Sequence, residues 1–131
     1  MSPEEQRIAI AEAMGWHDIQ EPIMFSALMA TPAGIAPTEP HRLFSTIPDY
    51  LNDLNEMREV EETLSVAEKP DSGGYSERNY YASKLGEITY NDNGRGWQPL
   101  SNDDCFPICH ATAAQRAEAF LRIKGLWKEA P

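Results

Sequence analysis

Residues 110–127 carry the signals for both ends of one helix, and this run constrains the fold more than any other part of the chain. Thr112 is followed three residues later by Gln115, the capping-box spacing in which each side chain accepts a hydrogen bond from an otherwise unpaired backbone N–H. Gly125 is expected to end the helix in the left-handed conformation, with Leu126 packing back onto the last turn. These residues indicate a structural role, and no catalytic signature of similar quality is present in the sequence.

The length and composition of the chain favour one cytoplasmic domain. A chain of 131 residues is long enough for one buried core, so we expect a single domain over residues 1–131. No stretch approaches the roughly 18 apolar residues of a membrane span, and residues 1–5 lack the basic and apolar regions of a secretory signal. Two cysteines are too few for a disulfide scaffold, which is typical of a reducing compartment. We therefore expect no membrane partner.

The chain is strongly acidic. Its 11 Lys and Arg residues against 21 Asp and Glu residues give a formal net charge of −10. The overall field therefore opposes nonspecific attraction to nucleic acid and to anionic lipid, and it fits a basic partner better. The simplest interpretation is that the acidity keeps the protein in solution.

The first half of the chain predicts a short helix followed by irregular structure. Ser2 as N-cap, Pro3 in the first helical position and Glu5 as the capping-box partner open a helix that ends at Gly15. Prolines recur between residues 16 and 47, so long helices are excluded there and strands are limited to short edge pieces. The two best strand candidates are Met24–Met29 and Arg42–Ser45.

Residues 48–64 predict a second helix that opens at Pro48–Tyr50 and buries one face. At helical periodicity the apolar side chains fall on one stripe, formed by Tyr50, Leu54, Met57 and Leu64. Glu61 also falls inside this stripe. The favoured interpretation is a carboxylate that reaches solvent near the helix end. The alternative is a buried functional acid, which a cation beside a buried Glu61 would favour.

The second half of the chain predicts a third helix, a hairpin and a last strand. Residues 68–74 form a loop, and Ser76–Leu85 is expected to be a helix, with a strand as the competing interpretation. A hairpin is predicted next, because two strand-like segments, Glu87–Tyr90 and Trp97–Leu100, flank a turn-rich segment. Phe106–Cys109 is a further strand candidate before the last helix. Together with the first half, this pattern predicts a single α+β domain with a small antiparallel sheet.

The candidate chemical motifs are better explained without chemistry. Cys105, Cys109 and His110 would suit zinc if His17 or His41 supplied a fourth ligand, but small buried cysteines beside a helix start are favoured. Cys109 next to His110 is a weak candidate for a thiol nucleophile, since an activating base is found in space and not by adjacency. The segment 91–96 lacks the acidic ligands of a calcium loop and the Lys-Ser/Thr pair of a phosphate loop, so a turn is favoured.

The region from 75 to 97 is rich in aromatic and basic side chains. Such groups stack bases and hold phosphates, although amphipathic aromatics at the edge of a core are the commoner outcome. The members of this set are Tyr75, Tyr80, Tyr81, Tyr90, Trp97, Arg78 and Arg95.

Three blocks of the chain resemble a known family. The segments Ile8–Trp16, Pro48–Met57 and His110–Arg122 together look like the phage ABA sandwich domain family, small proteins of phages and prophages. Met14 and Lys124 depart from the family's commoner residues. The resemblance implies a sheet sandwiched between helices in α/β/α layers and an origin in a phage or prophage. It implies no established activity.

From these observations we expect a non-catalytic accessory protein that acts by binding in the host cytoplasm. The most concrete version is counter-defence, in which the protein sequesters a nucleotide-like immune signal or blocks a host defence protein. Arg95, Trp97 and Arg116 are the predicted ligand contacts, the last because it lies near a helix N-terminus. We expect no catalytic residue, metal, cofactor or direct nucleic-acid partner.

Four alternatives stay open. The protein would be an acidic DNA mimic that inhibits a host nucleic-acid-binding protein, a small enzyme using Cys109 and His110, or a structural phage component. A homo-oligomer is also open, since small binding proteins often build sites between subunits.

Overall fold

The computed structural model describes residues 1–20, 32–37, 44–67, 75–92 and 110–129. The described helices and strands are α1 (Pro3–Ala13), β1 (His17–Gln20), β2 (Ala33–Ile35), β3 (Phe44–Thr46), α2 (Leu54–Glu62), α3 (Glu77–Asp92) and α5 (Ala113–Ile123). This combination of helices with a small antiparallel sheet confirms the predicted α+β fold of a single domain.

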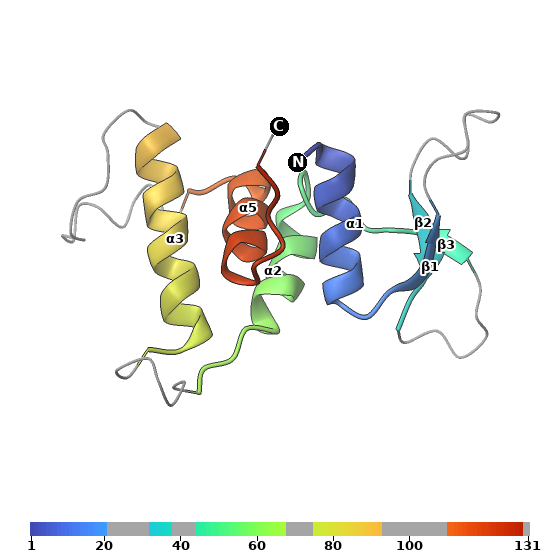
Figure 1. Ribbon diagram of the computed structural model, residues 1–131, viewed down its shortest axis with the longest axis horizontal. Helices are drawn as coiled ribbons and strands as arrows, with labels where there is room; N and C mark the ends of the chain where they lie inside the picture. Colours follow the sequence, from blue (N-terminus) through green and yellow to red (C-terminus); the bar gives the residue numbers. More distant parts are fainter. Residues whose placement is uncertain (21–31, 38–43, 68–74, 93–109, 130–131) are drawn as a thin grey trace.

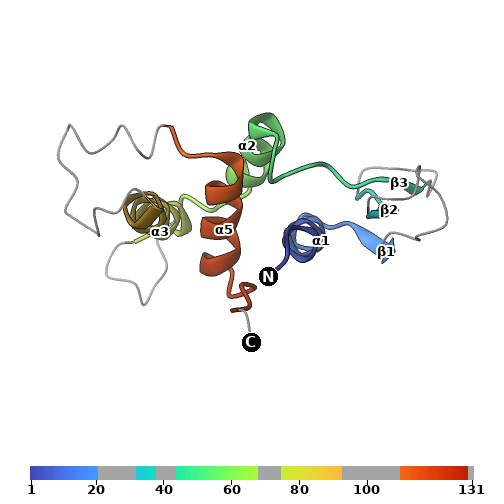
Figure 2. The same cartoon turned by 90° about the horizontal axis from the view of Figure 1, so that it is seen from above.

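Helix α5 occupies the centre of the helical part. It packs against α3, α1 and α2, and the three strands lie beside α1 at one end of the described molecule (Figures 1 and 2). Both views place the described helices on the same side of the sheet. The described residues therefore do not show the α/β/α layering that the family resemblance implied.

Helix α5 has the ends that its sequence predicts. The Thr112 hydroxyl accepts from the Gln115 backbone N–H at 3.1 Å, and the Gln115 side chain accepts from the Thr112 N–H at 2.9 Å. At the other end Gly125 has a φ of 71°, and the Leu126 N–H donates to the carbonyl of Leu121 at 2.9 Å, the long bond of a Schellman motif. The backbone prediction is confirmed, although the Leu126 side chain is 39% exposed and does not pack back closely.

Helix α1 is built in the same way. Ser2 and Glu5 form the predicted capping box, with bonds of 3.1 and 2.7 Å. Gly15 has a φ of 96°, and the Trp16 N–H donates to the carbonyl of Ala11 at 2.9 Å. The apolar side of α1 faces the core through its fully buried Ile10 and Ala11.

The second helix begins later than the sequence predicted. Residues 50–52 form a turn, and α2 starts after Asp53, whose side chain accepts from the Asn55 N–H at 2.9 Å. Asp49 does not act at the α2 N-terminus, because its carboxylate accepts two bonds from the Asn52 amide within the turn. The shift leaves Leu54 at the first helical position and 52% exposed, so its prediction as a buried residue is wrong.

Helix α3 extends beyond the predicted third helix. The helix interpretation of Ser76–Leu85 is confirmed for residues 77–85, whereas the strand predicted for Glu87–Tyr90 is wrong because α3 continues through it. Ile88 in this segment belongs to the core cluster that α3 shares with α5, and Thr89 and Tyr90 are also buried, so tertiary burial outweighs their local preference. Thr89 satisfies its hydroxyl inside the helix by donating to the carbonyl of Gly86 at 3.0 Å.

Several predicted segments lie outside the described residues. These are the strands Met24–Met29, Trp97–Leu100 and Phe106–Cys109, the loop 68–74 and most of the turn 91–96.

The sheet has the order β1-β2-β3 and is antiparallel throughout. β3 begins inside the predicted strand Arg42–Ser45, whereas β1 and β2 lie where only irregular structure was expected. Two residues of β1, Asp18 and Ile19, oppose Gly34 of β2, which is the pattern of a β-bulge. Asp18 takes a left-handed φ of 51°, which Asp tolerates better than most residues.

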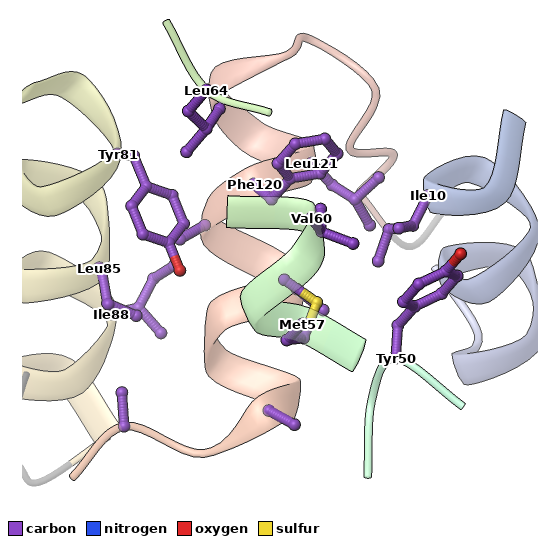
Figure 3. Packing of buried hydrophobic residues seen from close by; sticks show 14 of the residues in the cluster. Ile10, Tyr50, Met57, Val60, Leu64, Tyr81, Leu85, Ile88, Phe120 and Leu121 are labelled. Carbon is purple, nitrogen blue, oxygen red and sulfur yellow. The ribbon is translucent and has the colours of Figure 1, made fainter. Parts of the chain in front are cut away.

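The main core lies between the helices. Figure 3 shows how α5 contributes Phe120 and Leu121, α2 contributes Met57 and Val60, and α1 contributes Ile10. Alanines on the buried face of α5 leave room for neighbouring helices to approach; they are Ala113, Ala117 and Ala119. The core therefore rests on helix packing, and the sheet is attached to one edge of it.

Candidate functional site

A pocket of about 230 Å³ lies between the end of α2 and the first turns of α3. It is lined by Arg58, Glu61, Glu62, Leu64, Arg78 and Tyr81. Because side chains three and four positions apart share one side of a helix, residues 58, 61 and 62 of α2 reach this hollow together. The pocket thus combines charged groups with an apolar and an aromatic wall.

Arg78 is held in place by the end of α2. Its Nε donates to the carbonyl oxygen of Leu64 at 3.0 Å, and its Nη2 donates to that of Glu62 at 3.4 Å. These carbonyls belong to the C-terminal end of α2, where unpaired oxygens and the helix dipole favour a cation. Arg78 therefore joins α2 to α3 and brings a fixed positive charge to the pocket wall.

Glu61 and Arg116 form the best-buried ion pair among the described residues. Nη1 of Arg116 donates to both carboxylate oxygens of Glu61, at 3.0 and 3.2 Å, and the two side chains are 19% and 23% exposed, with Arg116 the more buried. The Arg116 Nε donates to the carbonyl of Ala111 at 3.2 Å. The favoured prediction of a carboxylate that reaches solvent is therefore wrong, because Glu61 is partly buried and paired with a cation.

The Tyr81 hydroxyl is a buried polar group without a hydrogen bond to the described residues. The residue is 7% exposed and projects from α3 into the space between α3 and α5 (Figure 3). Burial raises the pKa of the Tyr81 phenol far above its usual range, the Glu61 charge raises it further, and the Arg116 charge opposes the rise. The phenol is therefore neutral and carries a proton to donate at physiological pH.

Arg58 differs from the other arginines of the pocket. It is exposed on α2, and no described residue forms an ion pair or a hydrogen bond with its guanidinium group. The pocket lining holds two guanidinium groups, Arg58 and Arg78, and two carboxylates, Glu61 and Glu62, and the Glu61 carboxylate is paired with Arg116 from outside the lining. The charges of the lining therefore balance, whereas the whole chain has a net charge of −10.

A second hollow of about 280 Å³ lies between α1 and the segment after β3, lined by Pro3, Glu4, Arg7, Pro32, Asp49, Leu51 and Asn52. Its cation is already engaged, because Arg7 donates to the carbonyl oxygens of Ile47 and Pro48. Asp49 is likewise bonded to Asn52. These bonds connect α1 with the residues that precede α2. The polar groups of this hollow therefore have a structural role, and we do not take it as a ligand-binding site.

The predicted ligand contacts are not brought together within the described residues. Arg95 and Trp97 lie outside them, and Arg116 is directed toward Glu61. Among the aromatic residues of the same region, Tyr81 and Tyr90 are buried, which confirms the core interpretation for these two. The remaining pair, Tyr75 and Tyr80, is exposed with ring centroids 5.9 Å apart.

The thiol and zinc hypotheses also fall largely outside the described residues, since Cys105, Cys109 and His41 are not among them. His110 is exposed, and His17 pairs with Asp18 at 3.0 Å. In the part of the chain that the structure describes, no three His, Cys, Asp or Glu side chains gather closely enough to hold a metal ion.

The sequence alone did not single out Arg58. Arg78 and Tyr81 belonged to the aromatic and basic region noted above, but nothing in one-dimensional spacing indicates that they meet α2. The pocket arises from contacts between segments about 20 residues apart.

No protein-family model, curated protein or solved structure matches the chain. The resemblance to the phage ABA sandwich domain family therefore stays a prediction. Within the described ranges, none of the helices has the length and apolar character needed to cross a membrane.

Proposed function

We propose that this protein is a non-catalytic accessory protein of a phage or prophage that binds a small nucleotide-like anion by stoichiometric occupancy. The observation that carries the proposal is Arg58, a cation with no partner among the described residues, at a pocket whose other cation, Arg78, is fixed in place. The family resemblance supports the phage or prophage origin, and counter-defence is the role that this origin favours.

The pocket suits one anionic group better than several. Arg58 is free to approach a phosphate, while Arg78 is already oriented by α2 and adds charge without a further ordering cost. Glu62 also lines the pocket and opposes a second negative charge nearby. A volume of about 230 Å³ is below that of pockets for drug-sized molecules, so it fits one group of a nucleotide and not the whole molecule.

The test begins with ligand discovery. The protein is purified from cells that carry an activated nucleotide-signalling defence system, it is denatured, and the released small molecules are identified by mass spectrometry. In parallel, thermal unfolding is measured with inorganic phosphate, nucleoside monophosphates and cyclic nucleotides, since a ligand that binds only the folded state raises Tm. An empty preparation together with an unchanged Tm across the panel contradicts the proposal.

Arg58 provides the decisive variant. Arg58→Ala is expected to weaken anion binding by about tenfold or more with little change in the ligand-free Tm, because the side chain is exposed. Arg58→Lys should retain part of the affinity. Lys128→Ala is the matched control, since it removes the same charge from an exposed position outside the pocket. Equal losses in Arg58→Ala and Lys128→Ala would indicate a net-charge effect without a site.

A second candidate is a protein blocker that docks through acidic side chains. Asp53, the N-cap of α2, lies close to Glu56 and Glu59 on the helix, and the pKa of Glu56 is raised by partial burial and by the charges of Glu59 and Asp53. This cluster fits the basic surface of a host protein, as the DNA-mimic hypothesis requires. Charge reversal in Glu56→Lys/Glu59→Lys should abolish inhibition of such a partner while leaving anion binding at the pocket in place.

A further inference from the structure

We infer that Tyr81 is a ligand-binding residue of the α2–α3 pocket, whose hydroxyl donates a hydrogen bond to an oxygen of a bound phosphate monoester. The inference rests on the proposed function, because it concerns the same pocket. It adds a neutral donor to the two cations, and it predicts which part of the ligand enters deepest.

In the free protein, the unbonded Tyr81 hydroxyl lowers the stability of the folded state. A buried donor without a partner destabilises a folded protein by about 1–3 kcal/mol, and phenylalanine would fill the same space without that cost. Nearly all buried polar groups in folded proteins have partners, so an exception calls for a specific reason. Tyr81 lines the pocket, although its hydroxyl is closed off from solvent in the free protein, and a ligand oxygen would supply the missing partner once the neighbouring side chains move aside.

The charged side chains around Tyr81 also favour a bound phosphate. The neighbouring Glu61 carboxylate is already engaged by Arg116, which donates to both of its oxygens. The remaining pocket cations, Arg58 and Arg78, come from opposite walls, so a phosphate between them would be neutralised while an oxygen meets the phenol. The side chains on the α2 wall include the exposed Arg58, which can move to admit the group at little cost.

Glu61 offers a competing explanation, in which Tyr81 turns slightly and donates to this carboxylate. The two explanations differ in what Tyr81→Phe should do. A structural bond to Glu61 predicts lower stability of the free protein and unchanged affinity. A ligand contact predicts unchanged or higher stability of the free protein and lower affinity.

The experiment measures both quantities for the full chain. Affinities for inorganic phosphate, adenosine monophosphate and adenosine are determined by calorimetry, and unfolding free energies are determined in urea without ligand. Tyr81→Phe should weaken phosphate and adenosine monophosphate binding by about tenfold, with adenosine far weaker in every variant. Tyr50→Phe is the matched control, since Tyr50 is also buried but lies outside the pocket.

The other possible results distinguish the role of Tyr81 from the proposed function of the pocket. If Arg58→Ala weakens phosphate binding and Tyr81→Phe does not, the proposed function stands and the role of Tyr81 is overturned. If Tyr81→Phe lowers stability and leaves affinity unchanged, the bond to Glu61 is the correct explanation. If no phosphate-bearing probe binds the unmodified protein, both proposals fail.

Discussion

The helical part and the sheet of this protein are held together in different ways. Helix α5 is buried against α1, α2 and α3, and its ends are capped by residues from its own sequence. The strands have three or four residues each, and Ile35, a buried residue of β2, lies outside the main core cluster. Stability is therefore concentrated in the helices, while the sheet depends on close backbone contacts at one edge of the helical core.

The largest expected difference is between truncations in the two parts. Phe120→Ala should cost about 3–5 kcal/mol, because it opens a cavity where Phe120 is 1% exposed in the centre of the core. Ile35→Ala should cost about 2 kcal/mol, the low end for such a change, because its surroundings can relax. Urea unfolding measures both values. Equal costs would show that the sheet is as integral to the core as α5.

An intermediate difference is expected between the ion pairs of the two parts. Arg116→Ala should cost about 2–3 kcal/mol, because it leaves the Glu61 carboxylate partly buried and unpaired. His17→Ala at the sheet removes a pair whose side chains are 54% and 68% exposed, and it should cost less than about 0.5 kcal/mol.

A double variant identifies the cause of the Arg116 effect. Glu61→Gln combined with Arg116→Ala should recover part of the lost stability, since the unpaired charge is gone. No recovery would mean that Arg116 acts mainly through its bond to the carbonyl of Ala111.

The smallest difference is expected between two glycines. A Cβ atom at residue 34 would lie 3.0 Å from Cγ1 of Ile19 and 3.2 Å from the carbonyl oxygen of His17, so Gly34→Ala should cost about 1–2 kcal/mol. Gly125→Ala meets open space and should cost about 1 kcal/mol, from the left-handed φ of 71° alone. Thermal unfolding gives the total effect. In hydrogen exchange, Gly34→Ala should lower the protection of amides in the sheet, and Gly125→Ala should lower it at the end of α5. A uniform loss of protection in both variants would contradict this expectation.

Much of the helical framework was predictable, because its signals are local. The capping boxes at Ser2 and Thr112 and the terminating glycines at 15 and 125 involve bonds between residues at most five apart. The start of α2 was missed even so. The predicted opening at Pro48–Tyr50 precedes a turn, and the helix begins only after Asp53, whose side chain caps it.

The extent of α3 and the position of the strands were not predictable by the same means. The segment Glu87–Tyr90 contains residues that favour strands, and it is helical in a context where Ile88, Thr89 and Tyr90 are all buried. β1 contains an Asp residue in a left-handed conformation, so its irregular appearance in sequence reflects a real bulge. β2 depends on Gly34, whose close contact with Ile19 comes from another part of the chain.

The candidate site also combines residues that the sequence indicated with contacts that it did not. Arg78 and Tyr81 were noted within an aromatic and basic region, but their partners on α2 lie about 20 residues away and carry no mark in sequence. Arg116 was predicted as an anion contact from its place near a helix N-terminus. Its guanidinium group instead meets Glu61, a pairing across 55 residues.

The sequence by itself determined the places where α1 and α5 begin and end, because hydrogen bonds between near neighbours decide those features. It also indicated the α+β class, although not the positions of the strands. Only the tertiary structure decided the length of α3, the pairing of Glu61 with Arg116 and the pocket in which Arg58 and the Tyr81 hydroxyl have no partner among the described residues. Those features depend on which side chains are removed from water together, and burial of that kind is set by packing between distant segments.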